Sequence, residues 1–222
     1  MRTLVVSNFL SVDGVMQGPG GPEEDRSGGF DRGGWMVNYW DDEMRALLLG
    51  WNQETESMLL GRKTYEIFAA HWPYAPQDDP IAPLLNTMPK FVASRTLQKL
   101  DWNNSTLVDE PVPQGVAKLK GDGDGMMLMF GSGELIRTLA AHDLIDEFRL
   151  WIFPLLLGKG KRMFAGDSAP SGLKLAEARS FGTGVVLHRY QPAGKPTFGS
   201  FLNHNPPQVE LERRRRFAEA TS

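Results

Sequence analysis

The sequence predicts an α/β fold with a mainly parallel sheet, helices on its faces and an antiparallel hairpin near its C-terminal end. Strand-length apolar segments alternate with helical segments along most of the chain, and this order is typical of parallel strands joined by helices. Two or three strand-like segments then follow one another directly, which predicts the antiparallel edge. The 222 residues are 41% hydrophobic and 23% charged, which is enough apolar material for one sizeable core.

The first strand is predicted over residues 3–10, an apolar and β-branched run. Apolar side chains recur at helical spacing between residues 41 and 54 after an acidic first turn, which predicts a helix there. A short apolar strand over residues 57–60 leads into GRKTYEIFAAHW. That segment predicts a tight turn and a second helix that ends before Pro73.

The middle of the chain contains one clear strand–turn–helix unit. Short strands are predicted over 91–94 and 106–108, and a short helix over 113–119 is broken by GDGDG. MMLMF, residues 126–130, predicts a buried strand, and GSG then forms a turn into the helix ELIRTLAAH, with Ser132 as its cap. This order adds further parallel strands to the sheet.

A strand over residues 148–153 precedes the closing hairpin, whose strands are expected at 173–181 and 185–190. After Pro192 the composition changes to a segment rich in Gly and Pro and then to a charged helix. We therefore predict one domain over residues 1–191 and a C-terminal extension or tail over 192–222.

The tail contains four consecutive arginines, Arg213–Arg216. Such a run is compatible with a nucleic-acid patch, with a solvated helix or with a helix that docks on a second subunit. Glu210, Glu212 and Glu219 flank the arginines, which favours the solvated or docking helix.

Composition excludes several classes of function. The 24 basic and 27 acidic residues give a net charge of −3, so no global field attracts nucleic acid or an anionic membrane. The absence of cysteine excludes disulfides, thiolate metal sites and a cysteine nucleophile. The histidines are scattered without helical partners, so no metal site is predicted. With no signal-peptide pattern and no apolar stretch near the roughly 18 residues of a membrane span, we expect a cytoplasmic protein.

Three strand ends carry residues suited to phosphate. Gly61-Arg62-Lys63-Thr64 places backbone N–H groups, two cations and a hydroxyl where a strand turns into a helix. Ser94-Arg95-Thr96 offers two hydroxyls and a guanidinium, which suit a phosphate monoester. Gly131-Ser132-Gly133 allows close approach of a ligand at another helix start. Each segment also has an alternative without a ligand. Arg62 and Lys63 are then solvated cations, residues 94–96 form only a turn, and Gly131 and Gly133 are packing glycines at a helix start.

Together, a pyrophosphate site and a separate monoester site on one sheet are what NADPH requires. A Rossmann dinucleotide site is not supported, because Ile136 takes the third glycine position of GxGxxG. The long Gly- and Asp-rich loop over residues 14–34, closed by Trp35, Tyr39 and Trp40, favours a lid over a linker.

Several segments in order and spacing resemble the dihydrofolate reductase superfamily, and within it the branch similar to the reductase domain of bacterial riboflavin biosynthesis. They are SVDG (11–14), MLLGRKTYE (58–66), VASRT (92–96), FGSGELIRTLAAHDLIDEFRLWIFPLLLGKGKRMF (130–164) and the closing hairpin. The resemblance covers about residues 2–191. It implies a central mixed, mainly parallel eight-stranded sheet with NADPH laid across it.

The resemblance also implies roles for individual residues. It implies that the cofactor phosphates contact Leu60, Gly61, Arg62, Lys63 and Thr64. The adenosine 2′-phosphate is expected at Ser94, Arg95 and Thr96. The pyrophosphate and the nicotinamide ribose are expected at Gly131, Ser132, Gly133, Glu134 and Leu135. The loop after Asp13 corresponds to a lid over the nicotinamide, with Met16 near the ring.

The first helix departs from the family. Folate-reducing members carry a carboxylate there that pairs with the pterin, whereas here Asp41 and Asp42 lie at the helix start and ungapped counting places Arg45 at that position. This departure argues against folate reduction. Asp13, Asp41 and Asp42 are the catalytic candidates, but the alternative that Asp13 caps the loop turn and the other two cap the helix is favoured.

We therefore expect an NADPH-dependent reductase that passes hydride to a pteridine-like or riboflavin-precursor substrate, such as a 5-amino-6-(5-phosphoribosylamino)uracil. The small-molecule substrate is expected between the lid, at Trp35 and Trp40, and the first helix. The alternatives are dihydrofolate reductase activity and an NADPH-binding module with little turnover. A homodimer is expected, because related reductases commonly pair; nucleic acid and membrane partners are not.

Overall fold

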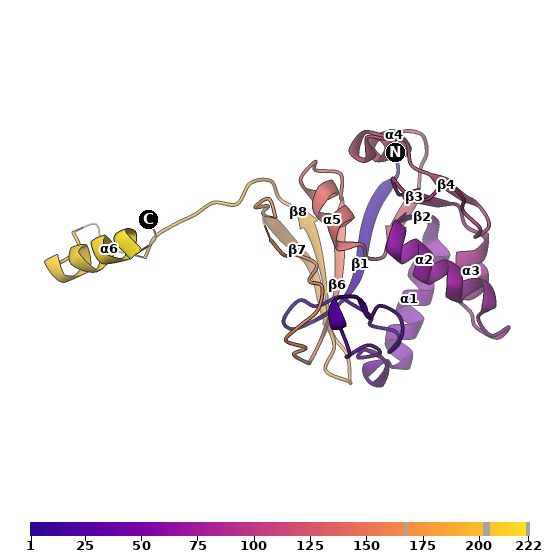
Figure 1. The fold of residues 1–222 in the computed structure, drawn as a ribbon, viewed down its shortest axis with the longest axis horizontal. Coiled ribbons are helices and arrows are strands. Elements are labelled where there is room, and N and C mark those ends of the chain that lie inside the picture. Colours follow the sequence, from indigo (N-terminus) through magenta and orange to yellow (C-terminus); the bar gives the residue numbers. More distant parts are fainter. Residues whose placement is uncertain (167, 202–204, 221–222) are drawn as a thin grey trace.

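The computed structural model describes residues 1–166, 168–201 and 205–220. Within this part of the chain one sheet has eight strands in the order β4-β3-β2-β5-β1-β6-β8-β7 (Figure 1). The strands are β1 (Thr3–Ser11), β2 (Thr55–Gly61), β3 (Lys90–Ala93), β4 (Ser105–Leu107), β5 (Met126–Met129), β6 (Glu147–Phe153), β7 (Leu173–Ser180) and β8 (Val186–Pro192). β8 runs antiparallel to β6 and β7, and the other neighbouring pairs are parallel. The predicted fold class is confirmed.

The described helices are α1 (Asp42–Glu54), α2 (Arg62–His71), α3 (Ala82–Thr87), α4 (Val112–Gly121), α5 (Gly133–Ala140) and α6 (Gln208–Ala220), with short 3₁₀ turns at Ser27–Gly29, Val37–Tyr39 and Trp72–Tyr74. The pattern of the sequence predicted all of the α-helices except α3. This helix lies in a proline-rich segment, and Pro83 sits in its first turn, where proline needs no N–H partner.

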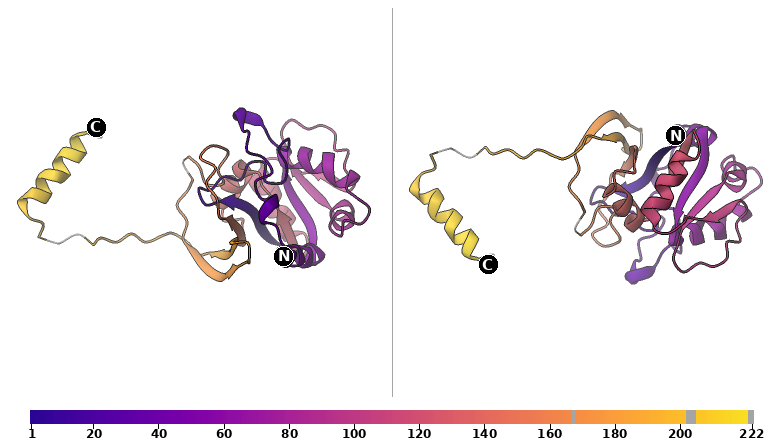
Figure 2. Two further views of the ribbon diagram at one scale, coloured as in Figure 1. Left: turned by 90° about the horizontal axis from the view of Figure 1, so that it is seen from below. Right: turned by 90° about the horizontal axis from the view of Figure 1, so that it is seen from above.

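Helices cover both faces of the sheet (Figure 2). Side chains alternate along β1, so that Leu4 and Val6 pack with Ile136 of α5, while Val5 packs on the opposite face with Met44 of α1. α4 lies on the α5 face, whereas α2 and α3 pack next to β2 and β3 on the α1 face. Because both faces are covered, the ends of the parallel strands are the places where this fold leaves room for a ligand.

Residues 193–201 lead away from the sheet, and α6 lies apart from the sheet in Figure 1. Two arginines of the tail are ion-paired within this helix: Arg213 and Arg214 each contact Glu210, at 2.6 and 2.9 Å. These pairs agree with the interpretation of a solvated helix. The division into a domain and a tail at residue 192 and the expected homodimer stay predictions. No helix of the described residues is long and apolar enough to span a bilayer.

Candidate functional site

A pocket of about 710 Å³ opens where the parallel strands β2, β3 and β5 end. Its wall contains all but one of the residues expected to bind the cofactor: Gly61, Arg62, Lys63, Thr64, Ser94, Arg95, Thr96, Gly131, Ser132, Gly133, Glu134 and Leu135. Leu60 is the exception, because its side chain is fully buried in the core. Segments separated by up to 74 residues in sequence therefore meet at one edge of the sheet.

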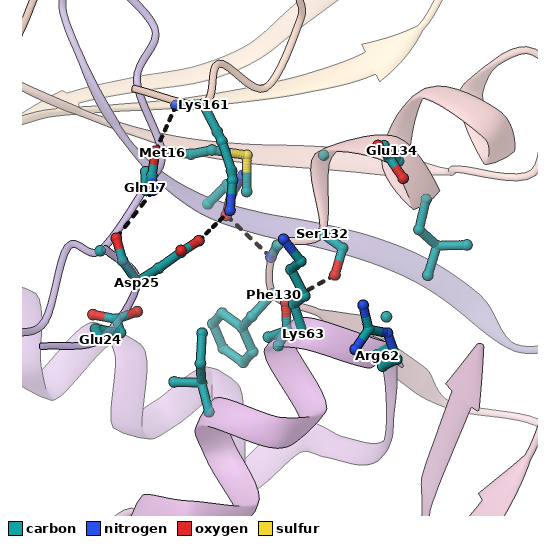
Figure 3. A pocket seen from close by; sticks show the side chains of 18 of the residues that line it. Met16, Gln17, Glu24, Asp25, Arg62, Lys63, Phe130, Ser132, Glu134 and Lys161 are labelled. Atoms are coloured by element: carbon teal, nitrogen blue, oxygen red, sulfur yellow. Dashed lines mark hydrogen bonds and ion pairs between the residues drawn. The ribbon is translucent and has the colours of Figure 1, made fainter. Parts of the chain in front are cut away.

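The first turn of α2 borders the pocket, and Figure 3 shows the side chains of Arg62 and Lys63 at this edge. Gly61 precedes the helix in an extended conformation, with no side chain to cap the first N–H groups. Arg62 contacts Glu66 one turn later at 3.3 Å, a pair in which both side chains are well exposed. The positive end of the helix and two cations thus face the pocket.

The start of α5 forms the second helix terminus at the pocket. Ser132 is the residue before this helix, but its hydroxyl makes no capping bond. It lies instead 2.9 Å from the hydroxyl of Thr64. Ser132 is thus the N-cap residue as expected, but its side chain makes no capping bond, because the hydroxyl contacts Thr64 instead. Gly131 adopts a φ of 55° and donates its N–H to Asn8 Oδ1 at 3.1 Å, which fixes the turn.

The end of β3 combines a turn with an exposed cation. Ser94 Oγ accepts hydrogen bonds from the backbone N–H groups of Thr96 and Leu97, at 3.2 and 3.0 Å. The side chains of Arg95 and Thr96 are exposed at the pocket wall. The segment is therefore a turn, as the alternative without a ligand expects, and this turn also places the Arg95 side chain at the pocket wall, where the phosphate-binding interpretation needs it.

The loop over residues 14–34 packs against the pocket side of the sheet. Gln17 is buried, and its amide nitrogen donates to the carbonyl oxygens of Asp25 and Ser27 at 3.0 and 2.9 Å, while its oxygen accepts from Lys161 N at 3.0 Å. The ammonium of Lys161 forms an ion pair with Asp25 and a 2.6 Å hydrogen bond with Ser27 Oγ. This side of the pocket, drawn in Figure 3, is therefore held by contacts between the loop and residues 160–162.

Two acidic side chains of this loop, Glu24 and Asp25, line the pocket. Glu24 Oε2 accepts hydrogen bonds from the N–H groups of Gly20 and Gly21 at 2.6 and 3.2 Å. Burial raises the pKa of Glu24 above its ordinary value, and the neighbouring charge of Asp25 acts in the same direction. Burial alone would raise the pKa of Asp25, but the hydrogen bonds from Lys161 and Ser27 outweigh this effect and lower the pKa below its ordinary value.

The three carboxylates expected to be catalytic lie outside the pocket. Asp13 accepts hydrogen bonds from Leu157 N and Gly158 N at 3.0 and 2.8 Å, and these bonds hold its pKa well below its usual range. Asp41 caps α1 by accepting from Met44 N at 2.8 Å. Asp42 is fully exposed. The structure shows the expected capping bond for Asp41, joins Asp13 to residues 157 and 158 after β6, and brings none of the three to the pocket.

The two tryptophans expected at the substrate pack into the core instead. Trp35 is buried, donates its indole N–H to Gln17 O at 2.8 Å and meets Phe153 edge-on. Trp40 packs against Phe9 and Trp151. Neither lines the pocket. The physical reason is the apolar face of β1 and β6, which these large rings cover.

Sequence reasoning missed seven polar residues of this site, namely Asn8, Gln17, Glu24, Asp25, Arg137, Lys161 and Arg162. Asn8 is almost fully buried in β1 beside the buried Ser7, and this polar interruption of a mostly apolar strand was an available signal. Glu24 lies in a run of acidic residues that resembles a solvated loop. Lys161 depends on contacts with residues more than 130 positions away, which no local pattern encodes.

Comparisons with known proteins agree with this geometry. The model of the family described as "RibD C-terminal domain" matches residues 2–187. "Uncharacterized protein YyaP" of Bacillus subtilis (strain 168) is 27% identical over 188 residues, which are 83% of this chain and 92% of that protein.

Two solved structures share the fold. A putative riboflavin biosynthesis protein from Shewanella sp. PV-4 has a TM-score of 0.62 at 22% identity, covering 86% of this chain and 99% of its own. A dihydrofolate reductase from Enterococcus faecalis, complexed with NADP(H), has a TM-score of 0.53 at 12% identity, covering 86% and 96%. At these identities the likeness concerns the fold alone.

Proposed function

Because this chain belongs to the family of the RibD C-terminal domain, we propose that it is an NADPH-dependent reductase acting on a pteridine-like or riboflavin-precursor substrate. One observation carries the proposal. Three strand ends, two of them followed by helix N-termini, converge on a pocket of about 710 Å³. When bound, NADPH supplies the hydride, and the protein's residues bind, orient and shield the reactants.

The donor set at the strand ends fits a dinucleotide. The first turns of α2 and α5 present N–H groups without side-chain caps. These groups would hold the pyrophosphate oxygens. Lys63 adds a positive charge beside them, and Arg95 supplies a planar guanidinium suited to a phosphate monoester. The proposed 2′-phosphate site is thereby separate from the proposed pyrophosphate site.

The rest of the pocket fits a flat reactant. Apolar side chains of Phe9, Met16, Phe68 and Phe130 line it and exclude water from the reacting atoms. Asn8 Oδ1 accepts from Gly131 N, and its amide nitrogen lies 3.6 Å from Met16 Sδ. Asn8 therefore positions the β5–α5 turn and the loop residue next to it.

A second candidate function is an NADPH-binding module with little turnover. The positions of Asp13, Asp41 and Asp42, all outside the pocket, are the observation that favours it. A turnover assay separates the two candidates: NADPH oxidation is followed with a riboflavin precursor and with a pterin. Oxidation above the substrate-free rate supports the reductase, whereas tight NADPH binding without oxidation supports the module.

The cofactor assignment is tested by fluorescence titration with NADPH and NADH. We expect Arg95→Gln to weaken NADPH binding about tenfold or more, because a charge-assisted bidentate contact is lost, and to leave NADH binding nearly unchanged. Lys99→Gln is the matched control, since Lys99 is exposed, pairs with Asp101 and does not line the pocket. Equal losses for the two cofactors contradict the 2′-phosphate role, and a wild-type protein that binds neither contradicts the cofactor proposal.

A further inference from the structure

Glu24 is a pocket-lining carboxylate that the cofactor assignment does not use. Figure 3 shows it beside Asp25 on the loop side of the pocket, across from Arg62 and Ser132. It therefore lies away from the strand ends assigned to the cofactor phosphates. The loop side of the pocket, beside Glu24, is the side left for a second reactant.

The carboxylate of Glu24 is held in place at one oxygen. Gly20 N and Gly21 N both donate to Oε2, at 2.6 and 3.2 Å. A Cβ added at Gly20 would lie 3.1 Å from the same oxygen, so glycine allows this close approach. Within the described residues, Oε1 receives no hydrogen bond. One oxygen thus fixes the head group and the other stays available to a ligand.

The two acidic neighbours of Glu24 are each paired with a cation. Glu23 contacts Arg26 at 3.3 Å and is largely exposed, and Asp25 forms its ion pair with Lys161. Glu24 has no such pair in residues 1–166, 168–201 and 205–220. The charge of His71 acts to lower the pKa of Glu24, but the two side chains form no ion pair in the described residues. A partly buried carboxylate without an ion pair carries a desolvation cost that a ligand with N–H donors lowers.

The shape of the pocket restricts what such a ligand is. Ile67, Phe68 and Phe130 line the same space, and their apolar surfaces suit a flat ring rather than a flexible polar chain. The available Oε1 accepts N–H groups, and an amino group next to a protonated ring nitrogen presents such donors on one edge of a flat ring. Apolar walls and one available carboxylate oxygen therefore select a flat heterocycle with N–H donors on one edge.

We propose that Glu24 is the substrate-selecting residue of this pocket and that it binds the N–H edge of an amino-substituted planar heterocycle. The inference rests on the proposed function, because it places the substrate beside the cofactor in the same pocket. It assigns substrate recognition to the loop after β1 and not to α1, which contributes no residue to the pocket wall in the described part of the chain.

The test compares two flat probes of similar shape by fluorescence titration in the presence of saturating NADP⁺. 2-Aminoquinoline presents an amino group beside its ring nitrogen, and 2-methylquinoline lacks the amino donor. We expect the wild-type protein to bind 2-aminoquinoline about tenfold or more tightly than 2-methylquinoline. Glu24→Gln should remove this preference, because the amide keeps the shape but brings an N–H group and no charge.

Glu23→Gln is the matched control, one residue away and turned to solvent, and it should keep the wild-type preference. A preference that survives in Glu24→Gln, or that is missing in the wild type, overturns the inference. Thermal unfolding of each variant verifies that the fold is intact, and Glu24→Ala is the second variant if Glu24→Gln unfolds early.

NADPH titration separates this inference from the proposed function. If Glu24→Gln binds NADPH as the wild type does and still prefers 2-aminoquinoline, the role of Glu24 is refuted and the reductase proposal stands. If the wild type does not bind NADPH, the reductase proposal fails. The comparison of the two probes in cofactor-free protein then decides on Glu24 alone.

Discussion

The hydroxyl groups of Thr64 and Ser132 lie 2.9 Å apart and join the first turn of α2 to the start of α5. These two helices follow neighbouring strands, β2 and β5, and both begin at the pocket. The hydrogen bond therefore fixes the spacing between two sets of helix N–H groups. A dinucleotide that bridges them depends on this spacing.

Gly61 leaves the space in which Ser132 sits, and Gly61→Ala tests that fit. An added Cβ would lie 2.2 Å from Ser132 Oγ, whereas φ at this glycine is −78°, which any residue adopts. We expect the free energy of unfolding to fall by about 1–3 kcal/mol from overpacking and NADPH binding to weaken as Ser132 moves. Urea unfolding and NADPH titration measure the two effects.

Gly50→Ala is the control for that experiment. Gly50 lies inside α1, and an added Cβ meets nothing within 4 Å. We expect a gain in stability of about 0.5–1 kcal/mol, since alanine is the better helix former, and unchanged NADPH binding. If Gly61→Ala binds NADPH as the wild type does, the Ser132 spacing does not govern the site.

The strand ends that line this pocket could be predicted from the sequence because their signals are local. A buried strand, a glycine turn and a helix start lie within a few residues of each other at both 58–66 and 126–136. The side formed by the loop after β1 could not be predicted in this way. Gln17 and Lys161 meet across 144 positions, and no pattern of neighbouring residues encodes that contact.

Residue type alone does not distinguish substrate-facing side chains from core side chains. Trp35 and Trp40 are large aromatic residues near a glycine-rich loop, and this pattern fits a ligand wall as well as a core. Their burial depends on Phe9, Trp151 and Phe153, which come from two strands far apart in the sequence. The carboxylates of Asp13 and Asp41 were ambiguous for the same reason, because capping and catalysis use the same side chain.

Asp41 and Asp42 provide a matched pair that separates these roles. Asp41 Oδ1 accepts from Met44 N at 2.8 Å, whereas Asp42 is fully exposed and 3.9 Å from Arg45. We expect Asp41→Ala to lower the free energy of unfolding by about 1 kcal/mol, because the helix cap is lost, and Asp42→Ala to change the free energy of unfolding by less. Neither substitution should change NADPH oxidation measured at saturating cofactor. A large loss of turnover in either variant, with the fold intact, would return that carboxylate to the catalytic candidates.

Asp13 links stability to pH through a carboxylate with a low pKa. Hydrogen bonds from Leu157 N, Ser11 Oγ and Gly158 N stabilise its ionised form and lower its pKa. A folded-state pKa below the unfolded value gives stability that is present above about pH 4 and is lost as the pH falls further. We expect Asp13→Asn to cost about 1–3 kcal/mol at pH 7, because the amide places an N–H group against backbone donors.

Urea unfolding of Asp13→Asn and wild type between pH 7 and 3 checks the sign. The difference in the free energy of unfolding should shrink as the pH falls below about 4, where the wild type loses its advantage. Asp78→Asn is the control, since Asp78 is exposed and should show no such trend. A difference that is constant or that grows toward acid contradicts the assigned origin of the low pKa.

Lys161 holds the loop over residues 14–34 against the pocket, and its replacement should loosen the loop. Its ammonium contacts Asp25 and Ser27, and its backbone N–H donates to Gln17 Oε1. Lys161→Met keeps the aliphatic stem and the backbone bond and removes the ion pair, a partly exposed interaction worth about 1 kcal/mol. Backbone exchange in peptides covering residues 17–31 should therefore be about fivefold faster by hydrogen–deuterium exchange.

Lys174→Met, at an exposed position on β7, should leave this exchange unchanged. Equal exchange in Lys161→Met and wild type would show that the ion pair does not hold the loop, because the three hydrogen bonds of the Gln17 side chain and the contacts of Lys159 with Gly29 and Asp31 stay intact in the variant.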